Sequence, residues 1–407
     1  MDTLWDHRYA QRTQAMTSSV IREILKITAR PDVISFAGGL PAPEIFPVKE
    51  FAEACDVVLS ENPTEALQYG ITEGYRPLRE YMAVRTGREG VKVTADNVMI
   101  TCGSQQALDL IGRILINPGD KILVESPTYL GALQAWSAYG AEYIAVPADG
   151  DGMRTDGLEA ALRSGPKLIY VLPNFQNPTG VTLSLERRKQ LVELADKYGV
   201  PIVEDDPYSA LRFEGEHIPS VMALDAQMRG ECAECYTGNV IYASTFSKIL
   251  APGLRLAWVV APPEVIFRMA QAKQGADLHT AVFTQMVAYQ VAHDGFLDKH
   301  LDVIRSVYHR RRDIMLESMG STFPKGVSWT RPKGGLFLWV TLPEYMKSTE
   351  ILQAAVEENK VAFVPGSPFF PCGGGENTLR MNYSNASDDG IREGMKRLGK
   401  TLKQFIQ

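Results

Sequence analysis

The sequence predicts an α/β protein in which a mostly parallel central sheet forms a large domain and a smaller α+β domain follows. Helical patterns such as residues 104–116 and 184–198 separate several short apolar runs in the middle of the chain. The runs span residues 97–103, 120–126, 141–147, 167–173, 200–206, 239–247 and 254–261. Strands that are apolar on both faces and alternate with helices are typical of a parallel sheet covered on both sides.

From about His279 the pattern changes to long, highly charged helical stretches. One of them is LDVIRSVYHRRRDIMLESM. It is followed by the strand-like run GGLFLWVTL and by a helical pattern after Ser387. No fixed-period repeat or Gly/Ser-rich linker is present, so we expect closely packed domains with a site in the cleft between them. We place an N-terminal segment at 1–48, a large domain at 49–285 and a small domain at 286–407.

Composition and charge narrow the classes of function. A chain of 407 residues with 45% hydrophobic and 22% charged residues has enough material for a large packed interior. A net charge of -6 gives no general reason to bind nucleic acid. The N-terminus has no apolar signal region and no apolar run is long enough to span a membrane, so we expect a cytoplasmic protein.

Cysteine and histidine spacing predicts neither a disulfide framework nor a metal site. Cys232 and Cys235 form a single CxxC in a polar stretch, without the further ligands that a structural zinc site needs. The six histidines show no paired ligand spacing. We interpret the cysteines as reduced thiols.

Residues 244–255, STFSKILAPGLR, carry the strongest local signal. They place Lys248 at the end of a buried strand and Arg255 seven positions later. An amine and an anion-binding guanidinium would then share one crevice at the carboxyl end of the sheet. The alternative is an exposed loop lysine.

Polar motifs follow two other strands, and a third polar motif lies between a strand and a helix. The turn Asn177-Pro-Thr-Gly and the sequence Asp205-Asp-Pro-Tyr208 are each also explained by turn or cap chemistry. Ser104 and Gln105 lie between a strand and a helix, where Ser104 suits the N-cap and free N–H groups with the helix dipole could hold a phosphate. Polar groups at several strand ends of one parallel sheet indicate a ligand site.

Taken in order, GSQQALD, Tyr129, NPTG, DDPY, STFSK and LRMNYS resemble the fold-type I aminotransferases that use pyridoxal 5'-phosphate (PLP), over nearly the whole chain. SFAGGLPAPEIFP (35–47), ALQYG (66–70), QAKQGADLHT (271–280) and FVPGSPFF (363–370) are similar to the bacterial 2-aminoadipate aminotransferases and kynurenine aminotransferase II. The resemblance therefore implies a large PLP-binding domain and a small C-terminal domain.

The resemblance implies roles for residues around the cofactor ring. Lys248 would carry PLP covalently and act as the base in the proton transfer. Asp205 would pair with the protonated ring nitrogen, which lets the ring accept electrons. Asn177 and Tyr208 would bind the ring oxygen O3', and Tyr129 would stack on the ring.

The resemblance also implies a phosphate site, completed by a second subunit. The residues assigned to the phosphate are Ser104, Gln105, Thr245, Ser247 and Arg255. Tyr69 would reach in from the partner subunit, which implies a homodimer with active sites at the interface. Position 245 is Thr where similar enzymes have Ser, but both side chains offer a hydroxyl.

Arg380 would bind the substrate α-carboxylate with two parallel hydrogen bonds, with Asn177 and Tyr69 nearby. Gly39 and Arg22 belong to an N-terminal segment that contacts substrate in similar enzymes, and Arg22 would recognise the substrate side chain. From the residues alone, Arg380 could instead form a surface ion pair, and Arg22 could be a solvated helix residue.

The function that the resemblance implies is a ping-pong transfer of the amino group from a broad range of L-amino acids to 2-oxoglutarate. Donors of such enzymes include 2-aminoadipate, aromatic and branched-chain amino acids. A PLP-dependent β-lyase is the alternative enzyme, recognised by release of ammonia without an acceptor. About thirty residues precede SFAGGLPAP, too few for a DNA-binding domain, which leaves a PLP-binding regulator without DNA binding as the non-catalytic alternative.

Overall fold

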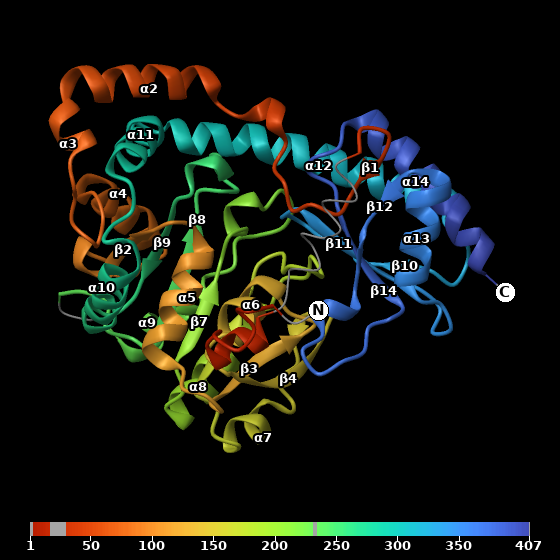
Figure 1. Cartoon of the computed structure of the whole chain (residues 1–407), viewed down its shortest axis with the longest axis horizontal. Helices are drawn as coiled ribbons and strands as arrows, with labels where there is room; N and C mark the ends of the chain where they lie inside the picture. Colours follow the sequence, from red (N-terminus) through yellow and green to blue (C-terminus); the bar gives the residue numbers. More distant parts are fainter. Residues whose placement is uncertain (1–2, 17–29, 231–233, 407) are drawn as a thin grey trace.

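The structure, a computed structural model, describes residues 3–16, 30–230 and 234–406 and contains two main sheets (Figure 1). In the larger sheet the strand order is β2 (Val98–Thr101), β9 (Ala257–Val260), β8 (Val240–Thr245), β7 (Ile202–Asp205), β6 (Leu168–Val171), β3 (Lys121–Ser126), β4 (Glu142–Asp149) and β5 (Gly152–Met153). Six of these strands run in the same direction, and β9 and β5 run in the opposite direction. The predicted mostly parallel sheet, with all seven predicted strands, is confirmed.

The expectation that these strands are buried on both faces is wrong for β4. Strands β2, β6, β7, β8 and β9 are buried along their whole length, whereas most of β4 is only half-buried or exposed. The reason is its place in the sheet. Its only neighbour on the outer side is the two-residue β5, which pairs with Ala148 and Asp149 alone.

Helices cover both faces of the large sheet because alternate strand residues point to opposite sides. Ile241 and Ala243 face one core, while Val240 and Tyr242 face the other. The first face is covered by α5 (Ser104–Leu115), α6 (Leu130–Ser137) and α10 (Pro263–Asp277); the second is covered by α4 (Arg76–Gly87), α8 (Leu185–Tyr198), α9 (Val221–Arg229) and α11 (Val282–Ala292). Among the described residues, no helix is both long and apolar enough to cross a membrane.

The smaller sheet lies on the other side of the molecule and is antiparallel (Figure 1). Its order is β10 (Ser328–Trp329), β11 (Phe337–Thr341), β14 (Thr378–Asn382) and β13 (Val364–Pro365), and its helices are α12 (Phe296–Thr322), α13 (Ser348–Asn359) and α14 (Asp388–Phe405). Separately, β1 (Ile34–Ser35) pairs in parallel with β12 (Val361–Ala362), which attaches the N-terminal segment to this part. The domain limits at residues 48 and 285 stay a prediction.

The remaining elements are short or peripheral. Helices α2 (Val48–Glu61) and α3 (Pro63–Leu67) pack on α11, and α7 (Leu158–Arg163) packs on α8. The short 3-10 helices are η1 (Gln11–Ala15), η2 (Pro43–Ile45), η3 (Ala95–Asn97), η4 (Ser209–Leu211), η5 (Pro252–Leu254) and η6 (Ser367–Phe369).

Local capping explains where two predicted helices begin, and for a third helix the predicted cap residue is corrected. Ser184 and Ser387 cap α8 and α14 by accepting hydrogen bonds from backbone N–H groups three residues on. The prediction that Ser104 is an N-cap is wrong, because Gly103 takes that position with a φ of 81° and Ser104 is the first helical residue. A Cβ at Gly103 would lie 2.4 Å from Nη2 of Arg255, so the tight approach of this guanidinium requires glycine.

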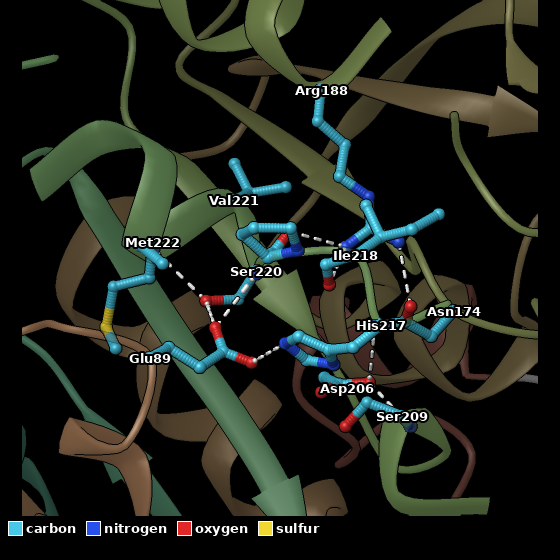
Figure 2. A network of polar contacts seen from close by, with 12 residues as sticks. Glu89, Asn174, Arg188, Asp206, Ser209, His217, Ile218, Ser220, Val221 and Met222 are labelled. Carbon is cyan, nitrogen blue, oxygen red and sulfur yellow. Dashed lines mark hydrogen bonds and ion pairs between the residues drawn. The ribbon is translucent and has the colours of Figure 1, made fainter. Parts of the chain in front are cut away.

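A buried arginine ties the ends of β6 and β7 together (Figure 2). Arg188 of α8 donates to the carbonyl of Pro173 at 2.9 Å and to Oδ1 of Asn174 at 2.7 Å. Asn174 in turn donates to Oδ1 of Asp206 at 3.0 Å. The polar loops at the carboxyl ends of these strands are thereby fixed relative to each other.

We predict that Arg188→Met lowers the free energy of unfolding by about 3 kcal/mol, because it leaves several buried acceptors without a donor. Urea unfolding followed by circular dichroism measures the change. Arg163→Met is the control, since the Arg163 side chain is 67% exposed and its loss should cost under about 0.5 kcal/mol. Equal effects of the two changes would contradict the structural role of Arg188.

Candidate active site

Residues that follow five strands of the large sheet meet in one cavity at the carboxyl ends of the parallel strands. The cavity has a volume of about 240 Å³. Its lining includes nine of the residues singled out from the sequence: Ser104, Gln105, Tyr129, Asp205, Tyr208, Thr245, Ser247, Lys248 and Arg255. The alternative of an exposed loop lysine is therefore wrong, because Lys248 lies inside the molecule.

One end of the cavity is rich in groups that bind anions. The first turn of α5 begins at Ser104, and the guanidinium of Arg255 lies against Gly103 beside that turn. Thr245 donates to Ser247 at 3.0 Å, so two hydroxyls lie together on the adjoining loop. Unpaired helix N–H groups, hydroxyls and a guanidinium form a suitable cradle for a phosphate.

At another wall, the carboxylate of Asp205 has one oxygen without a partner. Asp205 is 2% exposed, its Oδ2 accepts from the Tyr170 hydroxyl at 2.8 Å, and its Oδ1 has no hydrogen-bond partner. Burial raises the pKa of Asp205 to about 7, and the hydrogen bond from Tyr170 opposes this rise. A buried carboxylate with an unpaired oxygen is suited to a cationic N–H group, which would favour its charged form.

The amine of Lys248 donates to the carbonyl of Gly39 at 2.7 Å. Burial, together with the positive charges of Arg380 and Arg255, lowers its pKa to about 8. A larger fraction of Lys248 is therefore neutral near pH 7 than of an exposed lysine. A neutral amine is the form that can act as a nucleophile or a base.

Arg380 presents a fixed guanidinium beside the amide of Asn177. Arg380 is 1% exposed and donates to Oδ1 of Asn177 at 2.8 Å and to the carbonyl of Ala37 at 2.7 Å. The rings of Phe337 and Phe369 stack against it, with centroids 4.3 and 5.2 Å away. The alternative of a surface ion pair is thereby excluded, and the unpaired Nε of Arg380 is left for another acceptor.

Two tyrosines complete the walls. The ring of Tyr129 lies so close to Gly131 that a Cβ at position 131 would be 2.4 Å from Cζ of Tyr129. Burial raises the pKa of Tyr129 to about 12 and raises that of Tyr208 as well. Both hydroxyls therefore stay protonated at neutral pH and can donate hydrogen bonds.

Of the predicted residues that the structure describes, Tyr69 lies elsewhere. Tyr69 does not line the cavity of its own chain: it is 79% exposed and packs edge to face on His279, with ring centroids 5.7 Å apart. Arg22 lies outside the described residues.

The sequence interpretation missed Tyr170. This residue lies on β6 within the run KLIYVLP, where an aromatic side chain is typical of a hydrophobic core. Its position beside a strand end and its hydroxyl are the only signals in the sequence, and neither points to Asp205 on another strand.

A cluster of Glu214, His309 and Asp313 has ligand atoms within 4.8 Å of one another, and among the described residues it is the one group with that property. Arg312 forms ion pairs with both carboxylates of this cluster. Because the arginine already pairs with both carboxylates, the cluster does not indicate a metal site.

The arrangement fits PLP: a cradle for a phosphate, an unpaired carboxylate oxygen for a ring N–H and an amine for an aldehyde share one cavity.

Comparison with known proteins gives the same result. The family described as aminotransferase class I and II matches residues 33–398. Aromatic-amino-acid aminotransferase 1 of Thermococcus litoralis is 45% identical, with the alignment covering 99% of this chain and 96% of that protein.

Two similar solved structures contain cofactor or cofactor-substrate compounds. The alpha-aminoadipate aminotransferase of Thermus thermophilus, complexed with N-(5'-phosphopyridoxyl)-L-leucine, is 43% identical over 99% of both chains with a TM-score of 0.91. The kynurenine aminotransferase of Pyrococcus horikoshii, complexed with PMP, is 44% identical over 100% of both chains with a TM-score of 0.92. The resemblance seen in the motifs is thereby confirmed, and the chain belongs to the class I and II aminotransferases, which use PLP as cofactor.

Proposed function

We propose that this aminotransferase transfers the amino group of a broad range of L-amino acids to 2-oxoglutarate by a ping-pong mechanism, with Lys248 as the catalytic residue. The observation that supports it is the meeting of the Lys248 amine, the unpaired oxygen of Asp205 and Arg255 in one buried cavity. Similar proteins are named for aromatic amino acids, alpha-aminoadipate and kynurenine, and one contains a leucine adduct. We therefore include 2-aminoadipate, aromatic and branched-chain amino acids among the donors.

PLP supplies an aldehyde that reacts with amines and a ring that accepts electrons. The lowered pKa of Lys248 makes its Nζ available as the base that moves a proton from the substrate Cα. Asp205 holds a proton on the ring nitrogen through its Oδ1, and Tyr170 holds the other carboxylate oxygen. Asn177 and Tyr208 bind the ring oxygen, and Tyr129 stacks on the ring.

Arg380 binds the substrate α-carboxylate. Its plane is fixed by Phe337 and Phe369, so little side-chain entropy is lost when the carboxylate binds. Asn177 contributes to the same pocket through its contact with Arg380. Gly39, whose carbonyl accepts from Lys248, contributes to substrate binding in this proposal, and Arg22 recognises the substrate side chain.

The phosphate is held by Ser104, Gln105, Thr245, Ser247 and Arg255. We further propose a cytoplasmic homodimer in which Tyr69 of each subunit completes the phosphate site of the other. The exposed position of Tyr69 and of its neighbours Leu67 and Ile71 supports this proposal, since such a patch is typical of an interface.

To test the function, the visible absorbance of the bound cofactor is recorded while L-glutamate or L-2-aminoadipate is added. We expect the absorbance to fall without release of ammonia and to return when 2-oxoglutarate is added. The Lys248→Ala protein should bind PLP but lose at least about 1000-fold in turnover, because its base is missing. Catalytic release of ammonia without an acceptor would instead identify a β-lyase, and absence of any cofactor band would contradict the proposal.

We predict that Tyr170→Phe lowers kcat about tenfold and changes KM little. Loss of the hydrogen bond raises the pKa of Asp205, so its carboxylate holds the ring-nitrogen proton less well. Steady-state kinetics and a pH titration of the cofactor absorbance measure the effect. Tyr242→Phe is a matched control, because the buried Tyr242 donates in the same way to Asp206, a carboxylate that does not line the cavity. A similar loss in both variants would show that Tyr170 acts on stability alone.

We predict that mixing two inactive proteins restores activity if Tyr69 acts across the dimer. After unfolding and refolding together, Lys248→Ala and Tyr69→Ala subunits should form hybrid dimers with one intact site, giving about a quarter of wild-type activity. The activity of the mixture and of each protein refolded alone is compared. A mixture no more active than its parts would place Tyr69 in the site of its own chain.

A further inference from the structure

A fully buried lysine lies behind the phosphate-binding turn, and the chemistry above does not use it. Lys273 of α10 has a side chain with 0% exposure, and its Nζ lies 2.8 Å from three acceptors: Oε1 of Gln106 and both carboxylate oxygens of Asp277. An ammonium group has three hydrogens, so its bonding capacity is fully used. A buried charge this completely paired is fixed in one geometry.

Helix stability does not explain the pair of Lys273 and Asp277. Asp277 is the last residue of α10, where a negative charge opposes the helix dipole. A lysine four residues before an acidic residue is also the less favourable order of such a pair. The value of the pair must therefore lie in the contacts that it makes outside α10.

Those contacts all go to the turn that leads into α5. Asp277 accepts from Nε2 of Gln106 at 2.7 Å and from the thiol of Cys102 at 3.4 Å. Oε1 of Gln106 accepts from the backbone N–H of Cys102 at 2.8 Å, which closes the turn around Gly103. The side chains of Lys273, Asp277 and Gln106 thus hold residues 102–106 from behind, while Ser104 and Gln105 face the cavity.

The same support extends to the exposed surface that carries Tyr69. The residues directly after Asp277 include His279, whose backbone N–H donates to the Asp277 carbonyl at 2.7 Å. His279 contacts the ring of Tyr69 and accepts from the backbone N–H of Gly70 at 3.4 Å. Residues 273–279, which contain this ion pair, therefore connect the cofactor turn and the proposed dimer surface.

We propose that Lys273 and Asp277 are positioning residues for the binding of the cofactor phosphate. They act through Gln106, which fixes the turn at residues 102–106. The inference rests on the proposed phosphate role of Ser104, Gln105 and Arg255. Although this pair does not touch the cofactor, it would contribute to the preference of the protein for phosphorylated over unphosphorylated pyridoxal. The ion pair sets the direction of the N–H groups at the start of α5, and these groups are effective only when they point at the anion.

The test compares the binding of PLP and of pyridoxal, which lacks the phosphate, to the full-length protein freed of its cofactor. The variant is the double change Lys273→Met with Asp277→Leu, which removes the pair without leaving one buried charge alone. The control is Asp109→Leu with Arg113→Met, because these residues form an ion pair of the same spacing farther along α5. Dissociation constants are measured from absorbance and protein fluorescence, and circular dichroism verifies that each variant is folded.

We expect the double variant to bind PLP about tenfold more weakly and pyridoxal as wild type does, so that the ratio of the two constants falls about tenfold. The control should keep the wild-type ratio. An unchanged ratio would overturn the positioning role, whether both dissociation constants stay as in wild type or both rise by the same factor. If wild-type protein itself bound both ligands equally, the proposed phosphate site would fail and the inference with it, so the two failures are distinguishable.

Discussion

The buried carboxylate of Asp205 at the end of β7 is the constraint on which the rest of the site depends. A positive N–H group beside its unpaired oxygen would favour the charged form at this depth, and its other oxygen accepts from the Tyr170 hydroxyl. The parallel strands β6, β7 and β8 bring their carboxyl ends to one edge, so Asp205 and Lys248 can line one cavity and Tyr170 can donate to Asp205, although the three residues are far apart in sequence. The sheet thus supplies the geometry, and burial supplies the altered pKa values.

Much of the fold could be predicted because strand length and burial are visible in the sequence. Runs such as 239–247 are long, apolar and followed by polar motifs, and they became strands of the large sheet. The two-residue strands β1, β5, β10, β12 and β13 were not predicted, since two residues have no periodicity. The cap at Ser104 was misassigned by one position, because the close approach of Arg255 to Gly103 is a tertiary contact.

The same distinction holds for the site: residues in local motifs could be predicted, and residues whose roles depend on tertiary contacts could not. Lys248, Asp205 and Asn177 could be chosen from the sequence because each follows a strand and belongs to a recognisable motif. Tyr170 and Lys273 could not, because an aromatic residue in a strand resembles core and a lysine on a helix resembles surface. Their roles come from partners on other elements, which local patterns do not contain.

The pairing of β1 with β12 has a consequence for how the chain folds during synthesis. Ile34 and Ser35 find their partners only at Val361 and Ala362, and Phe36 accepts from the backbone N–H of Asn382 still later in the chain. The strand β1 can therefore be built into a sheet only after residues 361 and 362 have been synthesised. The large sheet, whose strands all lie between Val98 and Val260, can assemble much earlier, which leaves the N-terminal segment as the last piece to reach the cavity that it borders.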